Sequence, residues 1–467
     1  MRRLGALAIP AALLALLGWA AFIKPPWHDE LYTRWLSARG PAAIVDQLRH
    51  DSGPPLHYLL MHLWGAPAGY GVEWMRLFSV LCVVGAGLLL RKALVREEPS
   101  PVAPWVAPVF CLMPLSLYYA LEARAYALVL LLAAALLEGM AARRHPAWLA
   151  ALTALLLYTH SLSILLLPFL FAAPLLFRDR RLLWPPLLGM AAWLPFLPVL
   201  LGQPRDSIAW MQVPLSGVRV VHYLAGFAPA GPAFDLFPFP RGLLLPATFA
   251  GLTALLVALA LAARGAARTA SAGFLLTSGA LFALSAAFVN VYFPSRGEVM
   301  AWPFLALAGF ALLHRRLKPM IVHLVMGTLT VLLAVQALAW MRTLPQGLPW
   351  EEIAHGVRAR VGEGDRILVP GPWALSLEHY LRKAGGGASV EIFPPDQGVH
   401  PGWYWCRELT EGDRAMLREA VSSGGGNAVF LFRETTQPCA REAAEGLALK
   451  RIASFGPFLL ERVEGHK

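Results

Sequence analysis

Two adjacent acids, Asp29 and Glu30, stand directly after the first apolar stretch of the chain, within Pro25-Pro26-Trp27-His28-Asp29-Glu30-Leu31-Tyr32. The flanking Trp and Tyr residues favour the boundary between membrane and water. A carboxylate at such a boundary can accept a proton from a hydroxyl group during a reaction. The pair therefore suits chemistry on a substrate that is embedded in a bilayer.

Other charged and aromatic residues occupy comparable positions near the ends of apolar stretches. Arginines among them suit a phosphate group, because a guanidinium can bind two phosphate oxygens at once. Carboxylates, arginines and tyrosines at one bilayer edge suit a substrate with a phosphate head and a lipid tail. We predict that Asp29, Glu30 and Asp51 are catalytic and that Arg34, Tyr58, Glu122, Arg124, Tyr126, His160 and Arg296 bind the substrate.

Simpler roles for these residues stay open at this point. Asp29 can cap a surface helix, and Glu30 can pair with Arg34 one turn later. Glu122 and Arg124 can act as interfacial anchors.

A metal ion is a weaker alternative for the same region. His28, Asp29 and His160 are residue types that bind divalent metals. Their spacing in the sequence does not bring them together, so we expect no catalytic metal and no other cofactor.

The composition identifies the elements that must position these residues. Of 467 residues, 57% are hydrophobic and 15% are charged, and the mean hydropathy is +0.54. This is typical of a helical membrane protein with many spans. The net charge of +11 does not indicate nucleic acid, since no basic stripe lies on a soluble module. Met1-Arg2-Arg3 and the apolar run from Leu4 to Ile23 indicate an uncleaved signal anchor.

Basic residues predict the topology of eleven spans. Clusters of Lys and Arg follow alternate apolar segments, and such clusters favour the cytoplasmic side. This places the N-terminus inside and all the candidate residues outside. The segments are residues 4–23, 73–90, 101–118, 121–141, 147–159, 161–177, 182–201, 242–263, 271–291, 299–313 and 319–341.

The stretch 147–177 decides between ten spans and eleven. As one helix it would be roughly 46 Å long, and it would place Arg143-Arg144 and Arg178–Arg181 on opposite sides. Two short spans with a turn at Tyr158-Thr159-His160-Ser161 keep both clusters on one side. The polar residues of that turn favour the second arrangement.

The composition changes near residue 343. We predict a transmembrane domain over residues 1–342, with a catalytic first outer loop at 24–72, and an extracytoplasmic α/β domain over 343–467. Its glycine runs do not form a phosphate-binding loop, because they do not connect a strand to a helix. The expected strands are Arg366–Val369, Val390–Phe393, Ala428–Phe432 and Phe458–Val463, and the expected helices are Trp350–Val361, Ala374–Lys383 and Gly412–Val421.

The four cysteines are too few for a disulfide framework. Cys82 and Cys111 lie in apolar segments and are expected to pack in the core. Cys406 and Cys439 lie in the polar tail, where they can form a disulfide if the tail is extracytoplasmic.

Several motifs together resemble the bacterial family 39 glycosyltransferases. They are His28-Asp29-Glu30-x-Tyr32, Pro54-Pro55-Leu56-His57-Tyr58-Leu59-Leu60, Tyr118-Tyr119-x-x-Glu122-Ala123-Arg124-x-Tyr126 and Tyr158-Thr159-His160. These enzymes have the GT-C fold and are similar to protein O-mannosyltransferases and lipid A aminoarabinose transferases. The resemblance covers residues 5–180 well and the later spans more loosely.

The resemblance implies an inner-membrane transferase that takes a sugar from a polyprenyl-phosphate donor and passes it to a lipopolysaccharide, glycan or protein acceptor outside. It also implies that Asp29 is the catalytic carboxylate. Two positions depart from the family pattern. Gly53 replaces the usual His or Lys, and Arg296-Gly297 replaces an Arg-Tyr pair.

Two other classes of protein compete with this interpretation. A transporter or flippase of lipid-linked saccharides would place polar residues near the bilayer midplane and show internal repeats. A sugar polymerase or ligase fits the long outer loop at 202–241 in part. The acid pair favours the glycosyltransferase.

Overall fold

The computed structural model describes residues 2–96, 99–203, 215–228, 244–287, 292, 295–344, 349–393, 410–422, 427–436, 441, 443–445 and 447–466. The chain divides into two units. The helical unit comprises Met1–Lys24, Ser52–Gly202 and Ile208–Pro345, and the sheet unit comprises Pro25–Asp51, Gln203–Ser207 and Gln346–Lys467. The sequence placed the whole first outer loop with the spans, whereas the structure groups its first half with the C-terminal sheet.

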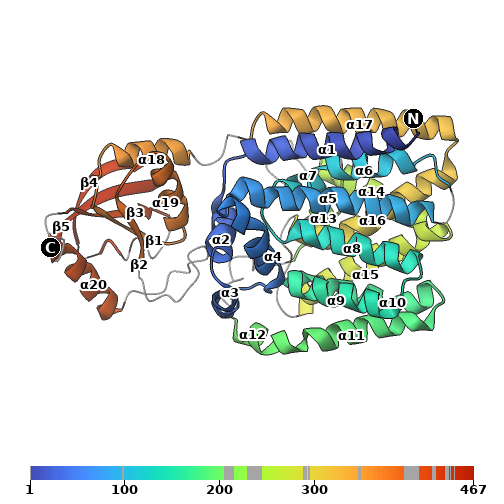
Figure 1. Ribbon diagram of the computed structural model, residues 1–467, viewed down its shortest axis with the longest axis horizontal. Coiled ribbons are helices and arrows are strands. Elements are labelled where there is room, and N and C mark those ends of the chain that lie inside the picture. The colour runs from blue at the N-terminus through green and yellow to red at the C-terminus, as the bar shows by residue number, and fades with distance from the viewer. Residues whose placement is uncertain are drawn as a thin grey trace. The chain divides into compact units, whose positions relative to one another are not determined.

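The helical unit is built from helices that run along one another (Figure 1). Long runs rich in Leu and Ala favour helix, and most breaks fall at Pro, Gly or basic residues. The helices are α1 (Arg2–Ile23), α4 (Leu56–Gly65), α5 (Val72–Val95), α6 (Ala103–Leu112), α7 (Pro114–Ala120), α8 (Tyr126–Ala141), α9 (Pro146–Thr159), α10 (Leu167–Leu176), α11 (Trp184–Trp193), α12 (Leu197–Gly202), α13 (Gly217–Ala225), α14 (Leu244–Ala262), α15 (Ala266–Ala287), α16 (Arg296–Arg316) and α17 (Pro319–Met341), with 3-10 turns η2 (Ala66–Ala68), η3 (Ser161–Leu166), η4 (Arg180–Leu183) and η5 (Leu194–Phe196).

Among the residues that the structure describes, five helical segments are long and apolar enough to cross a membrane, and the number rises to seven if each of two bent pairs is one span. One of these pairs is α6 and α7, which are bent by 66° at Met113. Four shorter apolar helices accompany them. The chain is thus a multi-pass membrane protein, while the count of eleven crossings stays a prediction.

The stretch 147–177 forms two segments that reverse at His160. Helix α9 ends at Thr159, His160 is extended with φ −155° and ψ 136°, and η3 and α10 follow. The two arginine clusters at the far ends of this hairpin line one pocket. This confirms that both clusters lie at the same end of the helices.

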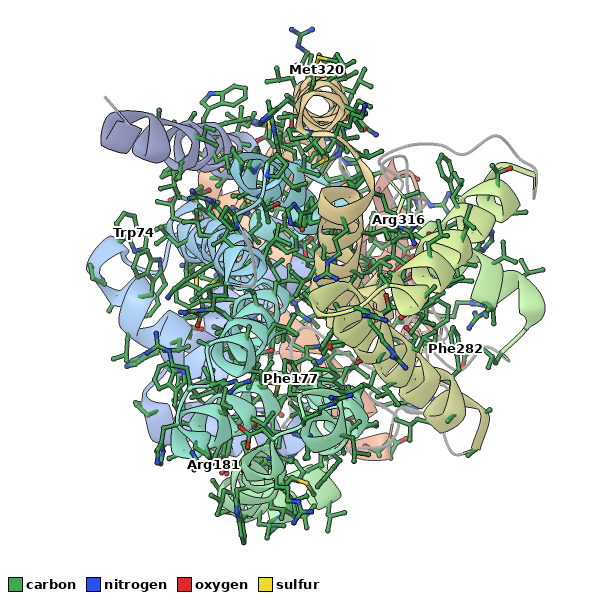
Figure 2. All side chains as sticks on the ribbon, turned by 90° about the vertical axis from the view of Figure 1, so that its right-hand side faces the viewer. Trp74, Phe177, Arg181, Phe282, Arg316 and Met320 are labelled. Carbon is green, nitrogen blue, oxygen red and sulfur yellow. The ribbon has the colours of Figure 1, made fainter. Side chains whose placement is uncertain are left out.

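Further contacts bring other basic clusters to that end, which we call the basic end. Lys92 in the last turn of α5 and Arg96 directly after this helix both pair with Glu138 near the end of α8, at 3.1 and 2.5 Å. Trp105 at the start of α6 donates to His323 at the start of α17 across 3.0 Å. Figure 2 views the helical unit with Arg181 and Arg316 labelled and several helices seen along their axes.

Helix α16 lies in the interior of the helical unit. Most of its side chains are buried, whereas α17 exposes much of its apolar surface. The Trp302 indole stacks on Phe110 with 5.6 Å between ring centroids and donates to the Ser116 hydroxyl across 2.7 Å. Because such contacts fix α16, its first residue, Arg296, is held in a defined place.

In its described ranges, the sheet unit contains five strands in the order β2-β1-β3-β5-β4. Strand β1 pairs in parallel with β2 and β3, while β5 pairs antiparallel with β3 and β4. The elements are α2 (His28–Ser37), α3 (Pro41–Gln47), η1 (Leu48–His50), α18 (Trp350–Arg358), β1 (Arg366–Pro370), α19 (Ala374–Lys383), β2 (Ser389–Phe393), α20 (Glu411–Ser422), β3 (Val429–Glu434), β4 (Leu447–Phe455) and β5 (Phe458–His466).

Both faces of the sheet are buried, which explains the nearly continuous apolar runs of its inner strands. In β3, Phe430 and Phe432 face one core, and Val429 and Leu431 face the other. The four predicted strands and three predicted helices match the structure closely. Strand β4 was not predicted, and Cys406 and Cys439 lie outside the described residues.

The segment 25–51 packs on the C-terminal elements of its own unit. The Tyr380 hydroxyl donates to the Pro26 carbonyl across 2.8 Å, and the His28 ring lies 5.3 Å from Trp373. Leu31 and Leu36 of α2 are buried. The acid pair is therefore carried by a helix that is anchored on α19.

Candidate active site

In the helical unit, the turn between α7 and α8 carries Glu122 and Arg124. The Ser79 hydroxyl donates to the Glu122 carbonyl across 2.6 Å, and the Lys24 ammonium donates to the Leu121 carbonyl across 3.0 Å. The Lys24 ammonium also pairs with the Glu122 carboxylate at 3.4 Å, where both side chains are largely buried. These bonds fix the backbone of the turn, so the side chain of Arg124 extends from a defined backbone position.

Lys24 itself is held by an arginine that no solvent reaches. Arg76 of α5 is fully buried, and its guanidinium donates to the carbonyls of Ala21 and Lys24 at the end of α1. The last carbonyls of a helix generally lack partners within it, and Arg76 binds two of those at the end of α1. Sequence reasoning missed both cations. The signal for Lys24 is a single lysine at the predicted outer end of a span, against the usual charge bias.

A row of aromatic rings connects this turn to the reversal at His160. The centroid distances are 5.2 Å from Tyr118 to Tyr119, 4.5 Å from Tyr119 to Tyr126 and 4.8 Å from Tyr126 to His160. The Tyr119 hydroxyl donates to the Ser295 hydroxyl across 3.2 Å, next to Arg296. The structure thus brings the predicted residues Tyr126, His160 and Arg296 to one region.

Two histidines in this region are strongly biased toward the neutral state. Burial lowers the pKa of His57 to about 3, and the positive charge of Arg124 adds to the effect. Burial likewise lowers the pKa of His160 to about 3, and the positive charges of Arg296 and Arg124 add to the effect. Both arginines therefore lie within electrostatic reach of His160.

His57 was not predicted as a site residue, although it directly precedes the predicted Tyr58 on α4. Tyr58 is nearly buried, and its ring lies 5.6 Å from His57. The Ser161 hydroxyl, next to His160, donates to the Ser52 carbonyl across 3.0 Å. This bond connects the loop that precedes α4 to the chain reversal at His160. The signal for His57 is its place in the Pro-Pro-Leu-His-Tyr motif.

The low histidine pKa predicts that stability is lost in acid. In the unfolded chain each imidazole takes up a proton near pH 6.5, but in the folded protein only near pH 3. Between these values the unfolded chain binds more protons, so the free energy of unfolding falls as the pH falls. For His57 this amounts to up to about 2 kcal/mol between pH 6.5 and pH 5.

Thermal unfolding of the purified protein at several pH values measures this slope. The His57→Gln variant should lose stability less steeply in acid than the parent. His145→Gln, which removes an exposed histidine, is the matched control and should keep the parent slope. Equal slopes for all three proteins would show that His57 does not titrate in this way.

Gly297 and Gly53, the two positions that differ from the resembled sequences, have different surroundings. A side chain at Gly297 would meet Leu281 at 2.7 Å and Tyr292 at 3.2 Å. At Gly53 the nearest atom is Tyr58 Cε2 at 3.9 Å, an ordinary contact. A Cβ at position 297 would therefore force Leu281 to move, whereas a Cβ at position 53 would make only an ordinary contact.

We expect Gly297→Tyr to destabilise the protein by about 1–3 kcal/mol, because overpacking displaces buried neighbours. Gly53→His should change the free energy of unfolding by less than about 0.5 kcal/mol. The shift of the unfolding midpoint in detergent compares the two variants. A tolerated tyrosine at 297 would mean that Leu281 and Tyr292 rearrange freely.

The predicted acids of the sheet unit are all buried. Asp29 is 4% exposed, Glu30 0% and Asp51 3%. Helix α2 begins at His28 with Trp27 as its N-cap, so Asp29 does not occupy the capping position. The Glu30 carboxylate accepts from the Trp27 amide across 3.3 Å, which is half of a capping box. The capping role at the start of α2 therefore belongs to Glu30 and not to Asp29.

Arg34 also has a partner other than the predicted one. Its Nη1 lies 3.1 Å from Nδ1 of His379 on α19. Glu30 and Arg34 thus fix opposite ends of α2. Glu30 binds the start of its own helix, and Arg34 binds α19.

Among the described residues, no three His, Cys, Asp or Glu side chains lie close enough together to hold a metal ion.

The predicted residues therefore fall into two groups. Asp29, Glu30, Arg34 and Asp51 belong to the sheet unit. The helical unit holds Tyr58, Glu122, Arg124, Tyr126, His160 and Arg296. These features define a multi-pass helical membrane protein with a cationic and aromatic site at one end of its helices and a separate sheet unit that carries buried acids.

Among solved structures, the chain is similar to ArnT from Cupriavidus metallidurans in the apo state, with a TM-score of 0.63 and 14% identity over 99% of this chain and 98% of that chain. It is also similar to ArnT of the same organism bound to undecaprenyl phosphate, with a TM-score of 0.60 and 14% identity over 98% and 97% of the two chains. The chain therefore has the ArnT fold, which is a GT-C fold.

A more distant likeness is to the oligosaccharyltransferase of Archaeoglobus fulgidus, crystallised with Zn and sulfate. The TM-score of 0.38 and 12% identity, over 91% of this chain and 68% of that chain, are too low to carry an argument. No protein-family model matches the sequence. No curated protein matches it either.

Proposed function

We propose that this protein is a glycosyltransferase that moves a sugar from a polyprenyl-phosphate donor to a hydroxyl group of a glycolipid, glycan or protein outside the cytoplasm. The observation that carries the proposal is that Arg124 and Arg296 both act electrostatically on His160, whose ring lies 4.8 Å from Tyr126, in a chain with the ArnT fold. A solved ArnT structure holds undecaprenyl phosphate. Paired arginines near a membrane edge suit the phosphate of such a lipid.

In this proposal Arg124 and Arg296 bind the phosphate of the donor and stabilise the charge that grows on it as the sugar leaves. Arg34 is a third candidate for this role. Burial keeps His57 and His160 neutral, and the positive charge of Arg124, joined at His160 by that of Arg296, adds to the effect, as expected for a cationic site. Tyr58, Tyr126 and His160 would contact the sugar, and Glu122 would hold Lys24 in place.

Asp29 is the proposed base. The acceptor oxygen attacks the anomeric carbon, its proton passes to the Asp29 carboxylate, and the bond between that carbon and the phosphate oxygen breaks. The electron pair of this bond leaves with the lipid phosphate, which needs no general acid. A single direct displacement of this kind inverts the anomeric centre. Asp51 would help to orient the acceptor.

The site would face the extracytoplasmic side, and the basic end would face the cytoplasm. The support is the charge bias: Lys92, Arg96, Arg143, Arg144, Arg178 and Arg181 gather at the basic end, and basic clusters favour the cytoplasm. The buried Cys82 and Cys111 are core residues, as expected.

Reconstituted protein tests the function directly. Proteoliposomes are incubated with a radiolabelled polyprenyl-phosphate sugar and lipid, glycan and protein fractions of a bacterial envelope. We expect label to leave the donor lipid and appear in one acceptor fraction. Label that crosses the bilayer while it stays on the donor would instead establish a transporter and overturn the proposal.

A further inference from the structure

A pocket at the basic end lies far along the helices from the proposed active site, at the other end of the α9–α10 hairpin. Its volume is about 580 Å³, and it is formed where α8 passes into α9 and α10 passes into η4. Four exposed arginines line it, Arg143, Arg144, Arg178 and Arg181, against a single acid, Asp179. The proposed function uses none of these residues.

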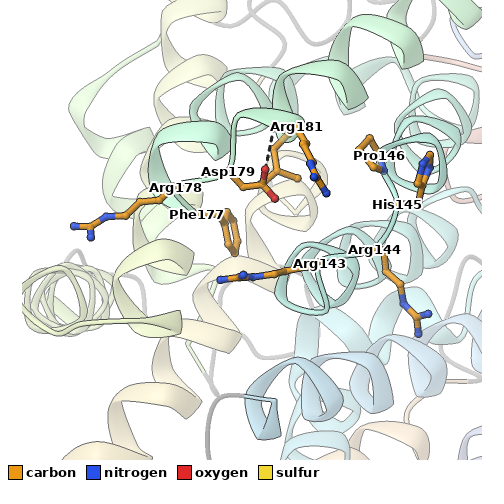
Figure 3. A pocket seen from close by; sticks show the side chains of 9 residues that line it. Arg143, Arg144, His145, Pro146, Phe177, Arg178, Asp179 and Arg181 are labelled. Carbon is orange, nitrogen blue, oxygen red and sulfur yellow. Dashed lines mark hydrogen bonds between the residues drawn. The ribbon is translucent and has the colours of Figure 1, made fainter.

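The charge in this pocket is not balanced by the protein. Among the residues that the structure describes, none of the four guanidinium groups forms an ion pair with a carboxylate. The Asp179 carboxylate instead accepts from the backbone amide of Arg181 across 3.0 Å, which caps η4. Figure 3 shows Arg181 near Asp179 and Arg143 near Phe177, while Arg144 and Arg178 extend outward in different directions.

Two of these arginines occupy backbone positions that normally favour glycine. Arg143 follows α8 with φ +51°, and Arg178 follows α10 with φ +52°. In both places the helix closes in the same way. The amide of Arg144 donates to the Gly139 carbonyl across 2.8 Å, and the amide of Asp179 donates to the Pro174 carbonyl across 3.1 Å.

This closing motif usually has glycine at the left-handed position, because a Cβ atom is strained there. Glycine at these two positions would end both helices with less backbone strain. The contribution of the arginines is therefore the guanidinium group that each places beside the pocket. Attraction of basic residues to the cytoplasmic side requires only Lys or Arg near the end of a span. It requires neither these two strained positions nor a shared pocket.

Apolar side chains next to the pocket place it at the depth of lipid headgroups. Leu175 in the last turn of α10 is 84% exposed, and Trp148 and Trp184 at the starts of α9 and α11 are each 56% exposed. Exposed tryptophans are typical of the boundary between acyl chains and headgroups. A small soluble anion would gain nothing from contact with these apolar side chains, whereas the acyl chains of a lipid would.

We propose that this pocket binds the phosphate of an anionic phospholipid from the leaflet at the basic end. Arg143 and Arg181 contact the phosphate, Arg144 and Arg178 widen the positive field around it, and the acyl chains lie along Leu175 and Trp184. Basic pockets between membrane helices suit such headgroups. The bound lipid would join the α8–α9 connection to the α10–η4 connection at the end of the hairpin that carries His160.

Thermal unfolding of the full-length protein in detergent tests the proposal, with phosphatidylglycerol, phosphatidylcholine or inorganic phosphate as the added probe. Phosphatidylglycerol should raise the unfolding midpoint with a saturable dose dependence, and the other two probes should not. The Arg143→Gly/Arg178→Gly variant should unfold at the parent temperature or higher without lipid, since strain is relieved. Its half-saturating concentration of phosphatidylglycerol should rise at least about tenfold, the equivalent of roughly 1.4 kcal/mol.

Arg264→Gln/Arg268→Gln is the matched control, because it removes two exposed arginines from the loop and helix start between α14 and α15. It should respond to phosphatidylglycerol like the parent. Arg181→Gln leaves both left-handed positions untouched and should also weaken the response.

An equal response of the parent and both pocket variants would overturn the site. A midpoint shift produced equally by inorganic phosphate would overturn its assignment to a lipid. Neither result depends on sugar transfer, so the proposed function and the lipid site can fail separately.

Discussion

Asp29→Asn is expected to reduce sugar transfer by about 10²–10⁴-fold, the range that a positioned general base contributes. Asparagine has the size of aspartate but cannot accept the proton of the acceptor hydroxyl. The buried position of Asp29, at 4% exposure, keeps the new side chain where the carboxylate was. The measurement is the initial rate of label transfer in proteoliposomes at saturating donor.

Two neighbouring substitutions separate chemistry from folding. Glu30→Gln weakens the bond from the Trp27 amide, so it should lower the unfolding temperature more than the rate. Asp46→Asn changes an exposed acid of the same unit, whose side chain is 78% exposed, and should change neither. If Asp29→Asn transfers sugar at the parent rate, Asp29 is not the base.

Loss of either arginine beside His160 is the second large effect that we expect. Arg124→Gln and Arg296→Gln should each lower kcat by about 10²–10³-fold, since they remove a donor aimed at developing phosphate charge. Arg124→Lys and Arg296→Lys should have higher rates than the Gln variants but lower rates than the parent. Lysine keeps the positive charge but cannot form the bidentate hydrogen bonds of arginine. The measurement is kcat and KM for the donor lipid.

The same substitutions carry a readout that is independent of turnover. Both arginines lower the pKa of His160, so their removal should raise it toward its ordinary value. NMR titration of specifically labelled histidine follows this change. An unchanged His160 titration together with an unchanged kcat would place both arginines away from the phosphate.

Much of the fold is predictable because its physical signals are local. The reversal at His160 follows from two clusters of arginine that must share one side of a membrane. The strands β1, β2, β3 and β5 follow from apolar runs between turn residues. Strand β4 was missed because Lys450 and Arg451 are exposed in its middle and register shifts at Ala448/Leu449 and Arg451/Ala453 interrupt its alternation.

The site is predictable only in part, because its members gain their roles from contacts far apart in the sequence. Arg124 and Arg296 were predicted from their places near span ends, and in the folded chain the charges of both lower the pKa of the buried His160. Arg76 gave no such signal, since a buried arginine that binds the carbonyls of Ala21 and Lys24 looks like any basic residue near the start of a span. The pairing of Arg34 with His379 joins residues 345 positions apart.

The grouping of residues 25–51 with the C-terminal sheet has a consequence for how the chain can be cut. The segment is joined to the helical unit at both of its ends, through Lys24–Pro25 and Asp51–Ser52, so the sheet unit is not an appendage on one linker. A protease that cleaves near residue 345 would leave two fragments held by the packing of Tyr380 on Pro26 and of Arg34 on His379. A chain that stops there from the outset would expose the apolar face of α2. Cleavage after folding should therefore be tolerated, whereas truncation at the same bond should not.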